Sequence, residues 1–235
     1  MSEDYYVDDQ GVAGVAANAS VADRGTFIAR VYNHVFGAII AFVLLEVWFF
    51  KTGIAYEVAS VMLNGSWLLV LGAFIVVGWI ARSAAHRAKS MTSQYLALGG
   101  YIIAEALIFI PMLVVAEYYA PGAIKSAGLL TLIGFGGLTW IAFNSRHDFT
   151  FMGGLLKWIG VVVLIAIVGS LVFGFQLGTW FSVLMVGVAG ISILRDTSAI
   201  IHHYPTDKHV AASLELFASV ALMFWYLLRI FTSRR

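Results

Sequence analysis

Seven long runs of apolar residues, separated by short polar or turn-forming segments, dominate the chain. A helix needs roughly 20 apolar residues to cross the hydrocarbon core of a bilayer, and each run is about that long. None of the runs shows the alternation of apolar and polar positions that is typical of a membrane barrel. We therefore expect an all-α polytopic membrane protein, a bundle of seven transmembrane helices. The expected spans cover residues 27–50, 66–85, 95–118, 122–143, 152–175, 177–200 and 209–231.

The composition supports an integral membrane protein and excludes several kinds of partner. Hydrophobic residues make up 61% of the chain and charged residues only 11%, which is not the composition of a soluble globular protein. The absence of cysteine excludes disulfides and thiolate metal sites. The net charge is only +1 and the basic residues are scattered along the chain, which excludes nucleic acid as a partner. Residues 1–25 are rich in acidic and small residues and do not resemble a signal peptide. We interpret them as a flexible acidic N-terminal tail, and residues 26–235 as the transmembrane domain.

The basic residues indicate how the bundle is oriented. The loop after the second span carries Arg82, Arg87 and Lys89, whereas the loops after the first and third spans carry only Lys51 and Lys125. Because cytoplasmic loops are enriched in lysine and arginine, this loop and the N-terminus are expected on the cytosolic side. Seven spans would place the C-terminus outside, but two arginines close the chain, so the side of the C-terminus stays open. The membrane we expect is a bacterial inner membrane.

Asp196 lies inside the sixth apolar run, where a charged side chain is strongly unfavourable unless it has a function or a partner. Small or hydroxylated residues precede it on the same helical face, namely Gly178, Ser182, Ala189 and Ser192. A face of this kind packs against other helices instead of lipid. Asp196 is therefore the leading candidate for a functional residue, and the adjacent Arg195 is its nearest candidate partner for a salt bridge.

Three glutamates inside the spans are further candidates. Glu215 begins a stripe on the last span that is spaced to face the same interior as Asp196. Glu105 lies near the middle of the third span, before Pro111, where either a hydrogen bond to backbone groups freed by the proline or a place on an ion path would explain it. Glu46 lies near the outer end of the first span, and we interpret it as a carboxylate that reaches the interface, with an ion path as the alternative.

The six histidines do not form a metal motif, because none is paired with another four residues away on a helix face. We expect no resident metal or cofactor. His203, at the cytosolic end of the sixth span, is expected to titrate near neutral pH close to Asp196. The chain also lacks the Gly-x-Ser-x-Gly and His-Glu-x-x-His motifs of membrane hydrolases, and its last span has no lysine for a retinal Schiff base. We therefore expect neither an enzyme nor a rhodopsin.

Three motifs occur in order within residues 27–231. They are Arg30-Val31-Tyr32-Asn33-His34, then Arg146-His147-Asp148-Phe149-Thr150-Phe151, and finally Asp196-Thr197-Ser198 followed by Ala211-Ala212-Ser213-Leu214-Glu215-Leu216-Phe217. Together they resemble the Bax inhibitor-1 family, the transmembrane Bax inhibitor motif proteins. The resemblance implies a seven-helix bundle with the last helix at its centre. It also implies a pH-sensitive calcium leak, in which two aspartates on the last two helices share protons and open or close the pore.

The match to this pair of aspartates is incomplete. Asp196 corresponds to the first, and Arg195 stands where a tyrosine is common in the family. The position of the second is Ser219, whose hydroxyl cannot share a proton as a carboxylate does. Glu215, one turn earlier on the same face, is the only acidic residue between positions 209 and 231. Either Glu215 replaces the second aspartate, or the pair is absent.

These observations lead to one main hypothesis and two alternatives. We expect a passive, proton-regulated pathway for cations, with calcium as the conducted ion, in which protonation of Asp196 removes the interactions of its charge and releases a closed state. Its partners would be the lipid bilayer, protons and transiently bound Ca²⁺. One alternative is a regulatory membrane protein that binds a membrane protease or a cell-death partner. The other is a proton-coupled cation exchanger.

Overall fold

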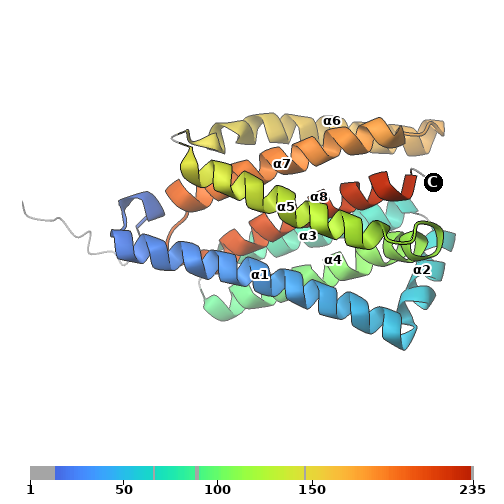
Figure 1. Ribbon diagram of the computed structural model, residues 1–235, viewed down its shortest axis with the longest axis horizontal. Coiled ribbons are helices and arrows are strands. Elements are labelled where there is room, and N and C mark those ends of the chain that lie inside the picture. Colours follow the sequence, from blue (N-terminus) through green and yellow to red (C-terminus); the bar gives the residue numbers. More distant parts are fainter. Residues whose placement is uncertain (1–13, 66, 88–89, 146, 234–235) are drawn as a thin grey trace, which may run out of the picture.

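The computed structural model describes residues 14–65, 67–87, 90–145 and 147–233, and these residues form a bundle of helices (Figure 1). Within them, one isolated bridge between Val15 and Pro205 is the only extended pairing. The α-helices are α1 (Val21–Thr52), α2 (Ile54–Asn64), α3 (Trp67–Arg87), α4 (Met91–Tyr119), α5 (Ala123–Asn144), α6 (Met152–Phe173), α7 (Gly178–His202) and α8 (His209–Ser233). Two short 3-10 helices, η1 (Ala16–Asn18) and η2 (Phe149–Phe151), precede α1 and α6.

Six of these helices are long and apolar enough to cross a membrane, counted over the described residues: α1, α4, α5, α6 together with η2, α7 and α8. Their number and length support a multi-pass integral membrane protein. Serine side chains fix where two of them begin. Ser20 accepts a hydrogen bond from the backbone N–H of Asp23 at the start of α1, and Ser90 accepts one from Ser93 at the start of α4.

The short helix α2 differs from the sequence-based prediction, which placed a loop between the first two spans. Gly53 has a φ of 82°, a left-handed conformation that suits glycine, and it ends α1 and caps α2. With 11 residues, α2 is roughly 16 Å long and cannot cross a bilayer. It packs on α4, and its buried face includes Ala55 and Ala59. The described part of the chain therefore has eight α-helices, and six of them meet the length and hydropathy of a span, compared with the seven spans predicted.

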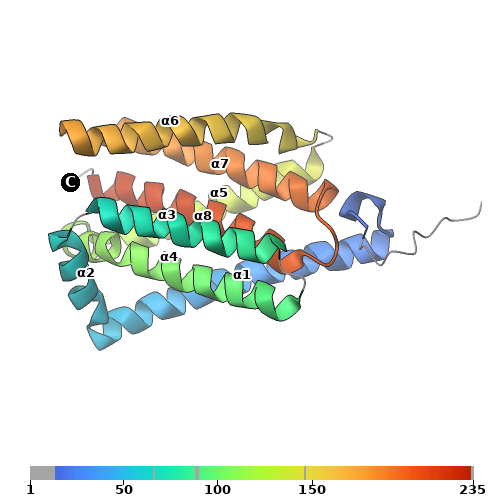
Figure 2. The same ribbon diagram turned by 180° about the vertical axis from the view of Figure 1, so that it is seen from behind.

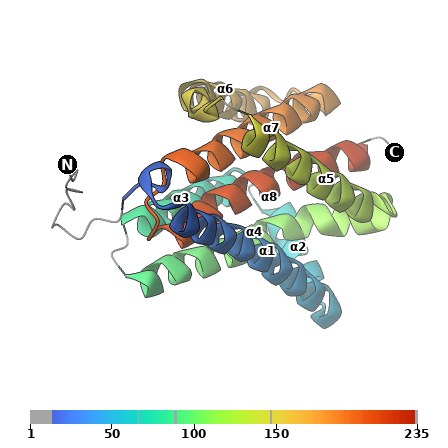
Figure 3. The ribbon, with the colours of Figure 1, turned by 60° about the vertical axis from the view of Figure 1, so that its left-hand side comes forward.

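The last helix, α8, lies at the centre of the bundle, as the resemblance implied. It packs against α1, α3, α4, α5 and α7, and Figures 2 and 3 show it enclosed by these neighbours from two further directions. Small residues on α8 allow the close approach, since Ala211, Ala212 and Ser213 are all fully buried. The buried polar side chains of this helix, such as Ser213 and Ser219, therefore point at other helices and not at lipid.

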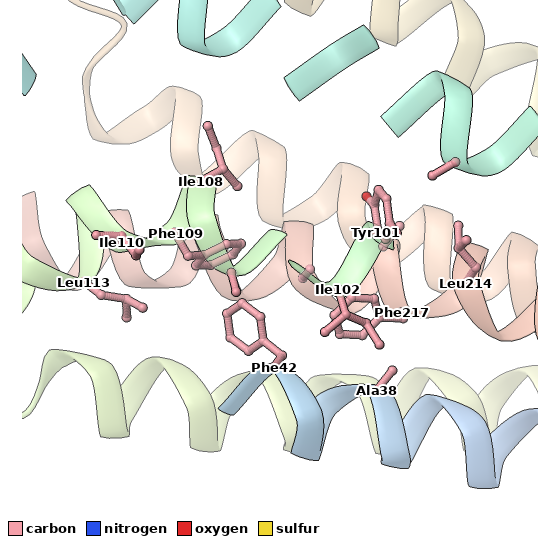
Figure 4. Close-up of a cluster of buried hydrophobic side chains, with 14 of the residues drawn as sticks. Ala38, Phe42, Tyr101, Ile102, Ile108, Phe109, Ile110, Leu113, Leu214 and Phe217 are labelled. Carbon is pink, nitrogen blue, oxygen red and sulfur yellow. The ribbon is translucent and has the colours of Figure 1, made fainter. Parts of the chain in front are cut away.

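Aromatic side chains fill the core between α1, α4 and α8. Phe42 packs edge-on against Phe109 with ring centroids 5.1 Å apart, and it also lies 6.4 Å from Phe217. Figure 4 shows Phe42 between α1 and α4 in this cluster. By contrast, α6 has no buried residue, and its main packing is on α7 and η2. The bundle thus has a tightly packed half and an outlying helix.

The segment before α1 is docked against the turn between α7 and α8. The backbone N–H of Ala16 donates to the carbonyl of Tyr204 at 2.9 Å, and Ala16 is fully buried. The sequence placed residues 1–25 in a tail, but α1 already begins at Val21, and η1 is folded onto the bundle. The part of the expected tail in residues 1–13 lies outside the described residues.

Candidate functional site

Asp196 on α7 faces α8, and each of its two carboxylate oxygens has a donor. The Ser219 hydroxyl of α8 donates to Oδ2 at 2.6 Å, and Nη1 of Arg195 donates to Oδ1 at 2.8 Å. Asp196 is only 5% exposed, so its carboxylate needs these partners. The sequence left open whether Ser219 or Glu215 meets Asp196. The structure brings Asp196, Arg195 and Ser219 together, and we call these three residues the Asp196 cluster.

The two donors of the Asp196 cluster differ in charge and in origin. Arg195 is the neighbour of Asp196 on the same helix, and its side chain is 39% exposed, so the guanidinium balances the buried charge while keeping contact with the surroundings. Ser219 is neutral and belongs to α8. The bond from Ser219 is short because its acceptor is a carboxylate. It is therefore the bond of this cluster that joins α7 to α8.

Glu215 belongs to a second cluster, formed with α3. Its Oε2 lies 3.0 Å from Nη1 of Arg82, and its Oε1 lies 3.1 Å from Nε2 of His86. The Glu215 side chain is 14% exposed, whereas the two basic side chains are each 45% exposed. Arg82 also lies 6.0 Å from the centre of the Tyr101 ring, within range of a cation–π contact. We call Glu215, Arg82 and His86 the Glu215 cluster, and no direct bond links Glu215 to Asp196 in the described residues.

A cavity of about 640 Å³ runs beside both clusters. Arg82 and Ser219 contribute to its wall from the two clusters, and Tyr101 and Glu105 of α4 line the same polar end. Glu105 is 5% exposed and lies one helical turn after Tyr101. Glu105 thus lines the same polar part of the cavity as Ser219. The sequence had suggested either a structural role or a place on an ion path for this residue.

His203 lies away from the Asp196 cluster, next to the segment before α6. Its Nε2 is 2.6 Å from Oδ2 of Asp148 and 3.4 Å from Oγ1 of Thr150. Partial burial acts to raise the pKa of Asp148, but hydrogen bonds from His203 and from the backbone of Thr150 outweigh it and lower the pKa to about 2. His203 therefore contacts Asp148, one of the residues of the second sequence motif, and no bond joins it to Asp196 in the described part of the chain.

Glu46 is buried inside the bundle, in contrast to its interpretation as a carboxylate that reaches the interface. It is 7% exposed, and neither carboxylate oxygen has a hydrogen-bond partner among the described residues. It is not among the residues that line the large cavity. The structure thus separates Glu46 from both clusters.

The two basic partners of Glu215 were not predicted from the sequence. Arg82 and His86 were considered only as signs of membrane orientation or as possible metal ligands. Their spacing of four residues places both on one face of α3, and that spacing was the signal that could have identified them. Over the described residues, no group of three or more His, Cys, Asp or Glu side chains is placed to hold a metal ion.

Comparisons with known proteins match nearly the whole chain. The sequence profile described as inhibitor of apoptosis-promoting Bax1 matches residues 24–235. The chain is 27% identical over 225 residues to a Golgi anti-apoptotic protein of Vaccinia virus (strain Lister), a match that covers 95% of this chain and 92% of the viral protein. It is 23% identical over 228 residues to protein lifeguard 4 of Mus musculus, covering 94% of this chain and 91% of the mouse protein. An uncharacterized protein of Campylobacter jejuni is 31% identical over 145 residues, which cover 58% of this chain and 62% of that protein. The matched family and its anti-apoptotic relatives are non-enzymatic membrane proteins.

Proposed function

Because this chain belongs to the Bax inhibitor-1 family, we propose that it forms a pH-sensitive leak pathway for cations, with calcium as the conducted ion. The observation that carries the proposal is the 2.6 Å hydrogen bond from Ser219 to Asp196, which joins α7 to the central α8. A buried carboxylate between two helices is a group whose protonation changes how those helices pair. The proposed gate is the Asp196 cluster.

In the closed state, ionised Asp196 accepts from Arg195 and Ser219. Protonation removes its negative charge, so the salt bridge with Arg195 is lost and the strong, charge-assisted bond from Ser219 becomes an ordinary one. The contact between α7 and α8 weakens, and the polar space beside Ser219 becomes continuous with the aqueous side. In this mechanism Ser219 takes the position of the second carboxylate of the family pattern. It acts there as a hydrogen-bond donor to Asp196 and does not share a proton with it.

Calcium is the proposed ion because the interior acids offer hard oxygen ligands. A leak requires weak and transient ligation, which a few carboxylate and carbonyl oxygens can provide, and no resident cofactor is needed. Glu105 lies at the polar end of the cavity and is the acidic residue proposed to meet the ion there.

The proposed topology has seven spans, with α3 as the seventh in addition to the six long apolar helices. At 21 residues, α3 is roughly 31 Å long, the thickness of a bilayer core. The short helix α2 would then lie at one membrane surface. By the distribution of basic residues, the N-terminus is proposed to be cytosolic and the membrane to be a bacterial inner membrane.

Reconstitution in liposomes tests the proposal directly. Calcium flux should rise as the pH falls for the wild type and for Glu215→Gln, and Asp196→Asn should abolish the pH dependence because its side chain cannot change charge. Lys51→Gln is a control that removes an exposed charge outside both clusters. Identical pH profiles for the wild type and Asp196→Asn would rule the proposal out, and saturable counter-transport would favour an exchanger.

A second candidate, a regulatory protein that binds a cell-death or protease partner, is favoured by the anti-apoptotic name of the viral relative. Here Asp196 would be a structural acid, and the acidic residues before Gly14 would be a contact for the partner. Deleting residues 1–13 separates the two functions, since it leaves the docked η1 segment intact. If the flux is unchanged but a purified partner no longer binds, the regulatory function is favoured. If both the flux and the binding are unchanged, residues 1–13 are not the contact for the partner.

A further inference from the structure

The large cavity extends from Ser219 toward the C-terminal end of α8, and this second part of its wall is mainly apolar. Its apolar lining includes Phe74, Ile108, Met112, Ile167, Leu171 and Leu222. Figure 4 shows Ile108 pointing away from Phe42, and Phe109 of the aromatic core also contributes to the cavity wall. An apolar cavity of several hundred Å³ is typical of a ligand site.

The same lining residues show that the cavity is a groove between helices. They belong to α3 and α4 on one side and to α6 on the other, with Leu222 of α8 as the floor, and Figure 2 shows α8 between α3 and α6. Ser192 adds α7 to the wall of the groove. Among the described elements, α3 packs on α2, α4 and α8, whereas α6 packs on α7 and η2, so no extensive helix contact closes the groove between α3 and α6. In a membrane, that side faces lipid.

Arg229 lines the groove at the C-terminal end of α8 and is half-buried. It forms no ion pair in the part of the chain that the structure describes, whereas Arg82 at the opposite end is paired with Glu215. Trp225 and Tyr226 line the groove beside it. Arginine with neighbouring Trp and Tyr near the end of a membrane helix is the usual arrangement at the level of lipid headgroups.

The length of the groove fits one lipid chain. Ser219 and Arg229 are ten residues apart on α8, which corresponds to roughly 15 Å along the helix. This is about half of the hydrocarbon thickness of a bilayer, the depth of a single leaflet. A chain whose headgroup is held at Arg229 would thus end near the polar space of the two clusters.

We propose that this groove binds an anionic phospholipid, with the phosphate on the Arg229 guanidinium, one acyl chain along α8 and the second chain in the bilayer. A guanidinium suits phosphate because it can donate two parallel hydrogen bonds. The headgroup of a zwitterionic lipid also carries a cation, which would need an acidic partner near Arg229. Among the described residues, Glu105 is the only acidic residue that lines the groove, and it lies at the opposite end. The charge of the groove at Arg229 therefore selects a lipid with a net negative charge. The site does not depend on the proposed leak, since it uses neither Asp196 nor Glu215.

Native mass spectrometry of the full chain, titrated with phosphatidylglycerol and with phosphatidylcholine, tests this assignment. The wild type should bind the first about tenfold more tightly, and Arg229→Gln should remove that preference. Arg229→Lys should retain most of it. Lys51→Gln, which removes an exposed charge at the end of α1 near the same end of the bundle, should bind like the wild type.

Ala221→Phe provides an independent arm, because it narrows the groove and leaves Arg229 in place; Ala221 lines the cavity and is 7% exposed. This variant should lose bound phosphatidylglycerol while its thermal unfolding stays cooperative. Equal binding of the two lipids by the wild type, or an equal loss in Lys51→Gln, would overturn the proposal. Oleate as a third probe distinguishes the source of the anion: tight binding of oleate without phosphatidylglycerol would assign the groove to a fatty acid and overturn the phospholipid.

Discussion

Asp196, which faces α8 from α7, and Glu215, which belongs to α8, are held in different ways. Asp196 is paired with an arginine from its own helix and accepts one hydrogen bond from the neutral hydroxyl of Ser219. Glu215 sends both oxygens across to α3, where Arg82 and His86 are its partners. Protonation therefore has different consequences at the two sites.

At the Glu215 cluster, charge is the link between helices, since both bonds that cross from α8 to α3 involve a basic side chain. At the Asp196 cluster, the charged bond lies within α7, and only the serine bond crosses to α8. The α3 contact should thus depend strongly on the negative charge of Glu215. The α7–α8 contact is also supported by extensive packing, so protonation of Asp196 should weaken it without separating the two helices. Such a partial change suits a regulated opening better than a purely structural contact.

The largest effect on stability is expected for Glu215→Gln. It removes the charge that pairs with Arg82 and His86, and we expect a loss of about 2 kcal/mol, below the 3–5 kcal/mol of a fully buried pair because both partners are partly exposed. Reversible unfolding in detergent micelles measures the loss, and hydrogen exchange should show faster opening of α3 than of α7. Glu57→Gln, an exposed glutamate on α2, is the matched control. Equal acceleration in α3 and α7 would contradict the separation of the two clusters.

A smaller effect is expected for Ser219→Ala, which removes the bond between α8 and Asp196. A hydrogen bond to a charged group contributes about 1.5 kcal/mol, so unfolding should require about that much less free energy. Ser170→Ala is the control, because Ser170 lines the same cavity but donates to the backbone of its own helix. A double-mutant cycle with Asp196→Asn should show that the two residues are coupled, and additive losses would contradict a direct bond.

Ser219→Asp changes the Asp196 cluster in the opposite way, because it adds an acidic group instead of removing a hydrogen bond. It places a carboxylate where the family pattern has one, about a hydrogen bond away from Asp196, so the two acids should titrate as a coupled pair. The pH profile of calcium flux should then show two steps where the wild type shows one. Glu215→Asp keeps one acid in its own cluster and should leave a single step. A single step in Ser219→Asp would argue that position 219 does not face Asp196.

The smallest effect is expected at the surface pair of Asp148 and His203. The pKa of Asp148 is lowered to about 2, so this pair stabilises the fold above the ordinary aspartate pKa of about 4 and loses that contribution as the pH falls toward 2. Because both side chains are well exposed, Asp148→Asn should cost about 0.5 kcal/mol at pH 6. Unfolding curves of variant and wild type should converge as the pH approaches 2. A difference that grows on acidification would have the wrong sign for this pair.

The helices were largely predictable from the sequence because apolar runs of bilayer length leave few alternatives in a membrane. The short helix α2 was not, since its 11 residues are too few to span and its start depends on the left-handed conformation of Gly53. The central position of α8 came from the family resemblance, and the packing of α8 on five helices agrees with it.

The site was predictable in part. The family pattern matched its second acidic position to Ser219 but left open whether Ser219 or Glu215 meets Asp196, and the structure places the Ser219 hydroxyl 2.6 Å from the carboxylate. The partners of Glu215 were missed because α3 approaches α8 from a distant part of the chain, and side-chain periodicity within one helix does not reveal which other helix it faces. The burial of Glu46 was missed for the same reason, since its position near the end of a span does not specify its neighbours.

The most direct test of the central claim is infrared difference spectroscopy of the reconstituted protein across the pH range in which calcium flux changes. A protonated carboxyl band should appear with the same pH midpoint as the flux, and this band should be absent in Asp196→Asn and present in Glu215→Gln. If the band lost in Asp196→Asn shows no change over the pH range in which the wild type opens, protonation of Asp196 is not what opens the pathway.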